Sequence, residues 1–355
     1  MTKVALLASH LPRRLLTIPS ETLLRQHRMM EVDTERRSVE GSDEVLSGSY
    51  YPTPLSPPYP LLSKKVELHR AMSASARSGR YVLSAADIVF EDHYLMVANK
   101  PAGVYCEAIL SSLSSSSMSS TINVKPELHL ANRLDRDTSG LMIITKSHKA
   151  AGRLVNAFTE HKVKKTYLAL CVGYAPNWNK IRISSGHGRS KFGAWRVYSA
   201  DDTGRVLPGG SSVKHMVTSF EVLFIDGKGK FREPADHELN EVDAVVVKEK
   251  TEREMNFSES SNEILIRAYP QSGRTHQIRL HSQYLGLPIK GDVKYGGVHE
   301  WKGIICDTHA LHAESLSFNH PITGVPVRIQ APLPLWASEI CGHKMEGLYL
   351  FAIID

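Results

Sequence analysis

The chain has 355 residues, of which 42% are hydrophobic, so it is long enough for one large or two small globular domains with some additional length. No apolar run approaches the ~18 residues of a membrane-spanning helix, so we expect no membrane partner. The charge balance is basic, with 43 Lys and Arg against 37 Asp and Glu, which is compatible with a polyanionic partner without requiring one.

Residues 1–30 alternate leucines with arginines and contain a single acid, Glu21. A basic, acid-poor amphipathic segment is typical of an organelle transit peptide, so we expect import into a plastid or a mitochondrion. The alternative is an ordinary basic helix in a protein of the cytoplasm or nucleus. Residues 31–80 are acidic and then proline-rich (YPTPLSPPYP), which predicts a linker or N-terminal arm with a helix from Ser63 to Gly79.

Residues 81–340 carry the strand and helix patterns of one domain. ADIVFEDHYLMVANKPAGV predicts strand, turn and strand, and the serine-rich residues 111–120 predict a loop. We expect a buried strand at 141–145, then a helix capped by Ser147, then a strand in KKTYLALCVG. The apolar face of that helix is predicted to carry Ala151, Leu154, Val155 and Phe158.

The second half of the domain is richer in glycine and charge. The stretch from Ser184 to Ser219 predicts loops or hairpins, and a charged insert is expected at about 226–260. EILIRAYP predicts a strand, which Gly273 turns into a helix, RTHQIRLHSQYLG. Residues 341–355 are expected to form a tail. Together these patterns predict an α+β fold with a mixed, largely antiparallel sheet flanked by helices.

The sequence predicts no metal site. The four cysteines, at positions 106, 171, 306 and 341, form no Cys-x-x-Cys pair, so we expect neither a disulfide framework nor zinc binding, and a reducing compartment fits. His276 and His281 are five residues apart, whereas two ligands on one helix face are separated by four.

The segment NRLDRDTSGL, residues 132–141, places a run of charge directly before an apolar strand. A buried carboxylate there stays ionised only if cations or hydrogen-bond donors compensate. Asp135 is therefore either a nucleophile or orienting base beside Arg133 or Arg274, or half of an Arg–Asp pair that closes a turn. The segment alone favours the turn. Asp137 precedes Thr-Ser-Gly, where aspartates commonly accept backbone N–H bonds, so we interpret it as structural.

Basic residues outnumber acidic ones between Arg133 and Lys165, which favours a nucleic-acid or phosphate-binding surface over a solvated helix face. Tyr167 follows this run directly. An aromatic ring beside a basic run can stack on a base while the cations contact phosphates, although a core tyrosine is the commoner outcome. Two carboxylates at i and i+2 also resemble a glycosidase pair, but no sugar-binding aromatic cluster accompanies them, so we do not favour that reading.

Several blocks of the sequence resemble, in order, those of the RluA-type RNA pseudouridine synthase family. They are VFEDHYLMVANKPAGV, NRLDRDTSGLMIITKS, VKKTYLALCVG, SGRTHQIRLHSQYLGLPIKGDVKYG and HALHAESLSFNHPITG, and they extend from about Asp87 to Pro334. Asn132 departs from the family's motif, which usually begins with histidine, but this position is not the nucleophile. The resemblance implies the family's fold, with its sheet and helices around a central catalytic cleft.

The resemblance also implies catalytic roles. It makes Asp135 the catalytic aspartate, Arg274 its ion-pair partner, and Tyr167 the residue that packs under the target uracil. The implied activity is the isomerisation of specific uridines in rRNA or tRNA to pseudouridine. The alternative is a non-catalytic RNA-binding or ribosome-assembly protein on the same fold, and the presence of all three residues argues against it.

Further residues are implied to bind the substrate. Arg133 would fill the space left by the flipped base, Ile278 would give the pocket apolar support, and Lys165 would be a further substrate contact. The reaction exchanges bonds within one nucleotide, so the resemblance implies no metal and no cofactor. The expected partner is RNA, bound by a monomer.

Overall fold

The computed structural model describes residues 51–116, 127–232, 243–250, 261–342 and 353–354. All of them belong to one unit of the chain, Tyr51–Asp355. The expected transit peptide lies outside the described residues, as do parts of the charged insert and of the tail, so the expectations for these segments stay predictions. The predicted serine-rich loop at 111–120 is wrong over its described part, because residues 111–116 form the end of helix α3, Cys106–Ser116.

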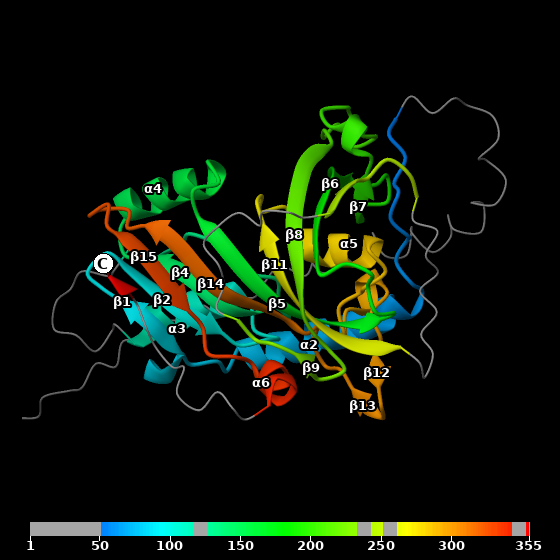
Figure 1. The fold of residues 1–355 in the computed structure, drawn as a ribbon. Coiled ribbons are helices and arrows are strands. Elements are labelled where there is room, and N and C mark those ends of the chain that lie inside the picture. The colour runs from blue at the N-terminus through cyan, green and yellow to red at the C-terminus, as the bar shows by residue number, and fades with distance from the viewer. Residues whose placement is uncertain (1–50, 117–126, 233–242, 251–260, 343–352, 355) are drawn as a thin grey trace, which may run out of the picture. The chain divides into compact units, whose positions relative to one another are not determined.

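A 14-stranded sheet runs through the described residues (Figure 1). Along its main path, only the pairs β4–β14 and β10–β6 are parallel, and the others are antiparallel. The predicted mixed, largely antiparallel sheet is therefore confirmed. In spatial order its strands are β1 Ile88–Glu91, β2 Leu95–Lys100, β4 Ser139–Thr145, β14 Leu311–Asn319, β5 Lys164–Gly173, β11 Asn262–Pro270, β8 Lys214–Ile225, β6 Lys180–Arg189 and β10 Asp243–Val246.

Short strands extend the sheet at its sides. They are β3 His129–Leu130 on β4, β15 Pro326–Gln330 on β14, β16 Ile353–Ile354 on β15, β7 Trp195–Tyr198 on β6 and β9 Lys228–Gly229 on β8. A separate hairpin pairs β12 Glu300–Trp301 with β13 Ile304–Ile305.

The helices lie along the edges and faces of this sheet. They are α2 Leu62–Ser78, α3 Cys106–Ser116, α4 His148–Thr159, α5 Gln277–Tyr284 and α6 Leu335–Cys341, with single 3-10 turns at η2 Ala85–Asp87, η4 Ala200–Asp202 and η5 Val293–Tyr295. None of the helices in the described part of the chain is long and apolar enough to cross a membrane.

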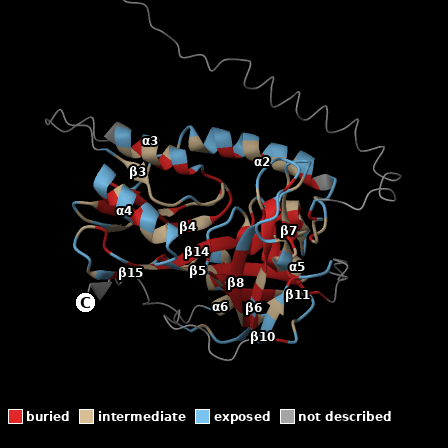
Figure 2. Cartoon of the chain, turned by 90° about the horizontal axis from the view of Figure 1, so that it is seen from above, coloured by how far each residue is buried: buried red, intermediate tan, exposed pale blue. Residues whose placement is uncertain are grey.

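Helix α4 shows how the sequence pattern determines packing. Ser147 caps it as predicted, because its side chain accepts a hydrogen bond from the Ala150 N–H at 3.3 Å. Leu154 is buried against β2 and β4 as predicted, but Val155 is 47% exposed and Ala150 is buried in its place. The helix is thus turned slightly from the predicted face. Figure 2 shows the exposed outer sides of α2 and α4 against the buried central strands.

The glycine-rich stretch predicted as loops or hairpins contains an antiparallel hairpin of β6 and β7, as predicted, and it also forms part of the long strands β6 and β8. Glycine has two uses here: Gly193, with φ 82°, lies in the turn of the hairpin, whereas glycines within β6 allow close packing. A Cβ on Gly186 would lie 2.6 Å from the Ser199 carbonyl oxygen, and one on Gly188 would lie 2.4 Å from the Leu207 side chain. At Gly186 the backbone of another segment lies too close for a larger residue, whereas at Gly188 the Leu207 side chain would have to move.

The arm predicted at 31–80 packs, over its described part, onto the domain rather than linking to it. Leu55 N donates to Val197 O at 2.8 Å, and the buried Arg70 of α2 donates from Nη1 to Gly291 O at 2.7 Å. Residues 51–80 are therefore part of the structure that surrounds the site described next.

Candidate active site

A pocket of about 640 Å³ opens beside the centre of the sheet, within the range of small-ligand sites. Its lining residues lie in four segments, 105–107, 133–138, 165–167 and 270–279, together with Leu311. These segments meet because their strands are close neighbours in the sheet: β4 and β5 lie on either side of β14, and β5 pairs with β11. The loop before β4, the start of β5 and the chain after β11 therefore open onto one cavity.

Asp135 lies in the loop before β4, and its carboxylate faces Arg279 of α5. Arg279 Nη1 donates to Asp135 Oδ2 at 2.8 Å. The other edge of the guanidinium donates to both oxygens of Asp292, at 2.6 and 2.7 Å, and the guanidinium lies 4.8 Å from the centre of the Tyr295 ring. Because Asp292 is almost fully buried and binds in a fork, it fixes the guanidinium in the orientation that Asp135 needs.

The predicted ion-pair partner of Asp135, Arg274, is wrong. Arg274 is exposed and lies in the turn before α5, where its Nε donates to His215 O at 3.2 Å. The helix begins at Gln277 rather than at Gly273, because the backbone of His276 is left-handed, with φ 57°. The two arginines therefore point in different directions, and the second one, Arg279, reaches the catalytic loop.

The sequence alone gave no signal that separates Arg279 from Arg274. In the structure, Arg279 stands between Ile278 and Leu280 in a helix in which every residue from Gln277 to Gln283 is buried. A guanidinium without a polar helix face requires a buried carboxylate partner.

The electrostatics of the site keep Asp135 ionised. Burial by itself raises the pKa of its carboxyl, but positive charge outweighs burial and lowers this pKa well below the ordinary value; His276 and His309 contribute only when they are protonated, whereas Arg279 contributes at every pH. Burial lowers the pKa of His276 to about 3 and that of His309 to about 4, so both rings are neutral near neutral pH. Arg279 is the permanent positive charge beside the carboxylate.

The structure brings Tyr167 and Lys165 to the same pocket as Asp135, as predicted. Burial, with a contribution from the Asp135 charge, raises the pKa of the Tyr167 phenol, so it stays protonated. Burial lowers the pKa of Lys165 to about 8, and its ammonium donates to Ser272 O at 3.1 Å. The pocket therefore combines a carboxylate, an aromatic ring and an ammonium group with a lowered pKa.

The two remaining predicted substrate contacts also line the pocket. Ile278 is buried, with 6% of its surface exposed, and forms part of the apolar wall. The side chain of Arg133 is 72% exposed at the mouth of the pocket, where Nη2 lies 2.8 Å from Oε1 of Glu107. Its exposure leaves it free to change partner.

The loop that carries Asp135 is held by buried polar groups. Asp137 binds the Arg136 guanidinium with both oxygens, at 2.7 and 2.6 Å. Its predicted structural role is confirmed, but it binds a side chain rather than the predicted backbone N–H groups. The sequence analysis missed Lys100, whose buried ammonium donates to the carbonyl oxygens of Pro101, Val104 and Arg136. Burial lowers the pKa of Lys100 to about 8.

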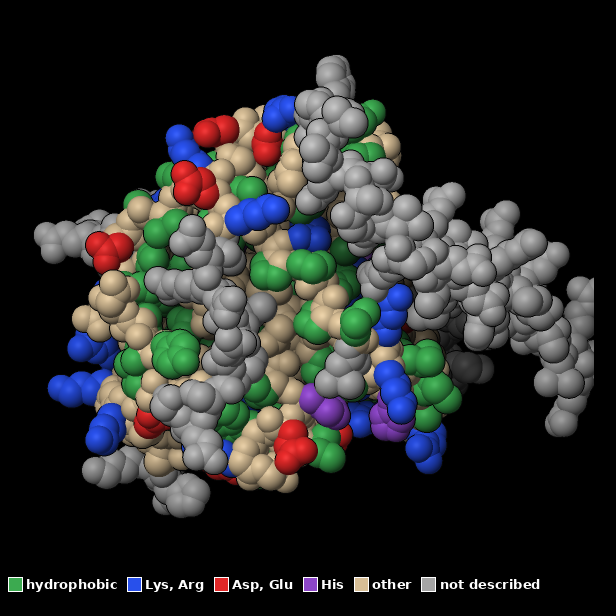
Figure 3. Space-filling view, turned by 90° about the vertical axis from the view of Figure 1, so that its right-hand side faces the viewer, with side chains coloured by type: hydrophobic (Ala, Val, Ile, Leu, Met, Phe, Trp, Pro, Cys, Tyr) green, Lys and Arg blue, Asp and Glu red, His purple; other side chains and the backbone are tan. Residues whose placement is uncertain are grey.

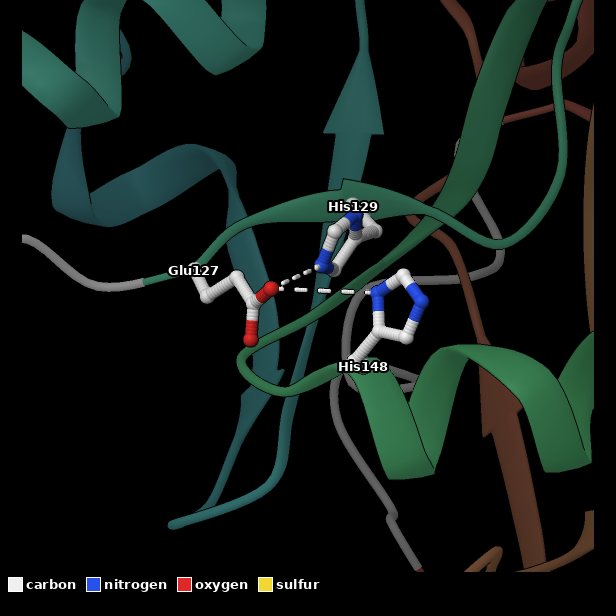
Figure 4. Close-up of side chains that lie close together, drawn as sticks. All are labelled: Glu127, His129 and His148. Carbon is white, nitrogen blue, oxygen red and sulfur yellow. Dashed lines mark ion pairs between the residues drawn. The ribbon is translucent and has the colours of Figure 1, made fainter.

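Away from the pocket, one group of side chains in the described residues has the spacing of metal ligands. Glu127, His129 and His148 point toward one another from the segment before β3, from β3 and from the start of α4 (Figure 4). The two histidines considered in the sequence, His276 and His281, do not belong to this group.

Comparison with known proteins agrees with the geometry. Residues 94–284 match the RNA pseudouridylate synthase family. The chain is 64% identical to a protein of Oryza sativa subsp. japonica named RNA pseudouridine synthase 1, over 81% of this chain and 84% of that one. It is 56% identical to the Arabidopsis thaliana protein of that name (81% and 87% covered) and 31% identical to ribosomal large subunit pseudouridine synthase C of Pasteurella multocida (73% and 68%). The chain therefore belongs to the RluA-type RNA pseudouridylate synthase family, as its motifs predicted.

Proposed function

We propose that the pocket receives one uridine turned out of an RNA strand and that Asp135 carries its isomerisation to pseudouridine. One observation supports this most directly: a carboxylate held ionised by Arg279 at the wall of a nucleoside-sized cavity. An ionised carboxylate in a sheltered cavity is a reactive group, because little water competes for it.

The reaction rearranges bonds within one nucleotide. The C1′–N1 bond breaks, the uracil turns, and a C1′–C5 bond forms. C5 loses a proton and N1 gains one, so that product and substrate have the same atoms. Asp135 assists by attacking C1′, by attacking the uracil ring, or by removing a ribose proton. All three routes require the ionised form that the site maintains.

Binding energy has to offset the extrusion of the base. Turning a nucleotide out of its stack costs a few kcal/mol. Stacking on the Tyr167 ring contributes about 1–3 kcal/mol, and phosphate contacts from Lys165 and Arg133 at the pocket add an electrostatic contribution. We assign the phosphate contacts to these two side chains because they line the pocket. On the side of the molecule seen in Figure 3, Lys and Arg side chains are scattered and form no single patch.

We propose a structured RNA as the substrate, with ribosomal RNA first and transfer RNA second. The Pasteurella multocida relative is named for the large ribosomal subunit, and this supports the first choice. We also propose that the protein acts as a monomer. The basic residues 1–30 support a second proposal, that it acts within a plastid or mitochondrion. A fluorescent fusion of this segment, followed in cells, tests the location.

The central experiment compares the wild-type chain with Asp135→Asn. Pseudouridines are mapped in organelle and cytosolic RNA of cells that lack the protein and are complemented with either form. We expect specific sites to be restored by the wild type alone, while purified Asp135→Asn binds the RNA within a few-fold of wild type. Restoration by Asp135→Asn would refute the assignment of the aspartate. Sites that do not depend on the protein at all would refute the enzymatic function.

A further inference from the structure

A chain of polar contacts leads from the N-terminal arm to the catalytic carboxylate. Tyr59 Oη lies 3.3 Å from Tyr295 Oη, and Tyr295 Oη lies 2.6 Å from His276 Nδ1. The other ring nitrogen, His276 Nε2, lies 3.7 Å from Asp135 Oδ2. We propose that Tyr59 and Tyr295 hold His276 as the Nε2–H tautomer, so that its N–H faces Asp135 and positions the carboxylate.

The backbone N–H of Trp195 donates to Tyr59 Oη at 3.2 Å and occupies one of its two acceptor positions. In the arrangement that we propose, Tyr59 donates its proton to Tyr295 Oη, and Tyr295 donates its own to His276 Nδ1. A neutral imidazole that accepts at Nδ1 carries its proton on Nε2.

The surroundings of His276 keep the ring neutral and fixed. Burial lowers the pKa of His276, as do the charges of Arg279 and Lys294, while Asp135 and Asp292 raise it. The Tyr295 ring meets the His276 ring edge-on, with centroids 5.5 Å apart at 76°. The packing of the two rings therefore fixes the orientation of the imidazole, with Nδ1 toward Tyr295 and Nε2 toward Asp135.

The backbone of His276 supports a functional role. Its left-handed conformation, φ 57°, is uncommon for a residue with a side chain and costs about 1–3 kcal/mol. Such strain persists where surrounding contacts impose it, and it turns the ring toward the pocket that the residue lines. At 3.7 Å the Nε2–Oδ2 contact is longer than a hydrogen bond, and contacts of this kind shorten when substrate binds.

The arm is fixed well enough to act on the site. Ser56 Oγ accepts from Val197 N at 3.1 Å, and Tyr59 meets Tyr295 edge-on at 5.5 Å. Residues 51–60, which the sequence predicted as part of a linker, thereby become part of the active-site support. This inference rests on the proposed role of Asp135.

The tautomer can be measured directly by nitrogen NMR on the full chain with labelled histidine, with His276→Gln used to assign the signal. We expect the Nε2–H form in the wild type. In Tyr295→Phe, which lacks the donor to Nδ1, we expect a mixture of the two tautomers, and a smaller shift in Tyr59→Phe. An Nδ1–H tautomer in the wild type would overturn the proposal.

Kinetics on the same variants provide the second measurement. We expect Tyr295→Phe to lower kcat about 10-fold to 100-fold, with little change in KM for RNA, because the carboxylate is misdirected but the RNA contacts remain. Tyr198→Phe, a buried tyrosine that does not line the pocket, is the matched control and should retain wild-type kcat. If Asp135→Asn is inactive but Tyr295→Phe has wild-type kcat, the relay is refuted while the proposed function stands.

An independent observation concerns the group formed by Glu127, His129 and His148. Glu127 Oε1 lies 3.6 Å from His129 Nε2 and 3.7 Å from His148 Nδ1, and all three ligand atoms lie within 4.8 Å of one another. Tetrahedral zinc with bonds of about 2.0–2.1 Å places its ligand atoms about 3.4 Å apart. The geometry points to a divalent transition-metal site on the surface, for which two imidazoles and a carboxylate favour Zn²⁺ over Mg²⁺ or Ca²⁺.

A second feature of this group also points to a ligand. The Nε2 atom of His129 is shielded from solvent and has no hydrogen-bond partner in the described structure. Buried imidazole nitrogens are normally paired, so an unpaired one aimed at a carboxylate beyond hydrogen-bond distance is unusual. The ion would join β3 to the start of α4, just before the loop that carries Asp135, and so stabilise that loop.

The test uses the chelator-treated full chain and Zn²⁺ alone, titrated against a chromophoric competitor. We expect a Kd below about 10 μM for the wild type and binding at least tenfold weaker for His129→Ala and His148→Ala. His69→Ala, which removes an exposed histidine of α2, should bind as the wild type does. A wild-type Kd above about 100 μM, or full affinity in His148→Ala, would mean an adventitious ion only and refute the site.

Discussion

Arg279 Nη1 donates to Asp135 Oδ2 across 2.8 Å although 144 residues separate the two in the chain. The same guanidinium is held from behind by Asp292. One arginine thus serves two carboxylates with different tasks: Asp292 is buried and fixes the cation, whereas Asp135, with 28% of its side chain exposed, faces the pocket. Asp135 is ionised because a fixed positive charge lies beside it.

This arrangement predicts that Arg279→Lys lowers kcat at least 100-fold. A lysine has a point charge and cannot bind Asp292 in a fork while also reaching Asp135, so the carboxylate loses its fixed partner and its pKa rises. The measurement is single-turnover pseudouridine formation at saturating enzyme.

Arg274→Lys is the matched control for that substitution. Because Arg274 does not contact Asp135, we expect kcat to stay within about threefold of wild type, with any loss appearing in KM. The assignment of the partner would be wrong if Arg274→Lys proved the more damaging of the two.

RNA affinity should depend on pH through Lys165. Burial lowers the pKa of its ammonium to about 8, so the side chain is charged below that pH and loses its charge as the pH rises through it. We therefore expect RNA binding by the inactive Asp135→Asn variant to weaken between about pH 7 and 9. Lys165→Arg, which stays charged, should remove this dependence.

The exposed neighbour Lys164 provides the control for the pH experiment. Lys164→Arg should leave the decline in affinity above pH 8 intact. An unchanged pH profile in Lys165→Arg would show that another group is responsible.

Salt dependence tests the phosphate contacts. The logarithm of the RNA association constant should fall linearly with the logarithm of salt concentration, because bound counterions are released. Arg133→Gln should reduce the slope by about 0.7–0.9, the contribution of one phosphate contact. A slope that does not change would remove Arg133 from the RNA-binding surface.

Two glycines give a paired prediction for stability. Gly140 has φ +107°, and an added Cβ would lie 2.3 Å from the Ala313 carbonyl oxygen, where β4 meets β14. We expect Gly140→Ala to lower the free energy of unfolding by at least ~2 kcal/mol. Gly152 lies in α4 with open space around its Cβ position, so Gly152→Ala should raise it by about 0.5–1 kcal/mol.

Urea denaturation of both variants measures the difference. The packing explanation for Gly140 would fail if its alanine variant were as stable as the wild type. Equal changes in the free energy of unfolding for the two variants would also count against this explanation.

Local patterns in the sequence determined much of the fold. The short apolar runs in KKTYLALCVG and EILIRAYP predicted β5 and β11 almost to the residue, because strands in the middle of a sheet are buried on both faces. Patterns that mix glycine with charge were less informative. The stretch containing Gly186 was correctly predicted to include a hairpin, but its long strands were missed, because the same residue that permits a turn also permits close packing of two strands.

The candidate site divides in the same way. The residues alone favoured a turn for Asp135 and a core position for Tyr167, and it was the resemblance of their motifs to the family's that assigned both of them, with Lys165, to one site. Only the tertiary structure decided that Arg279 rather than Arg274 pairs with Asp135, and that Tyr59 reaches the site. An ion pair depends on the direction in which a helix starts, and here one left-handed residue, His276, determines that direction.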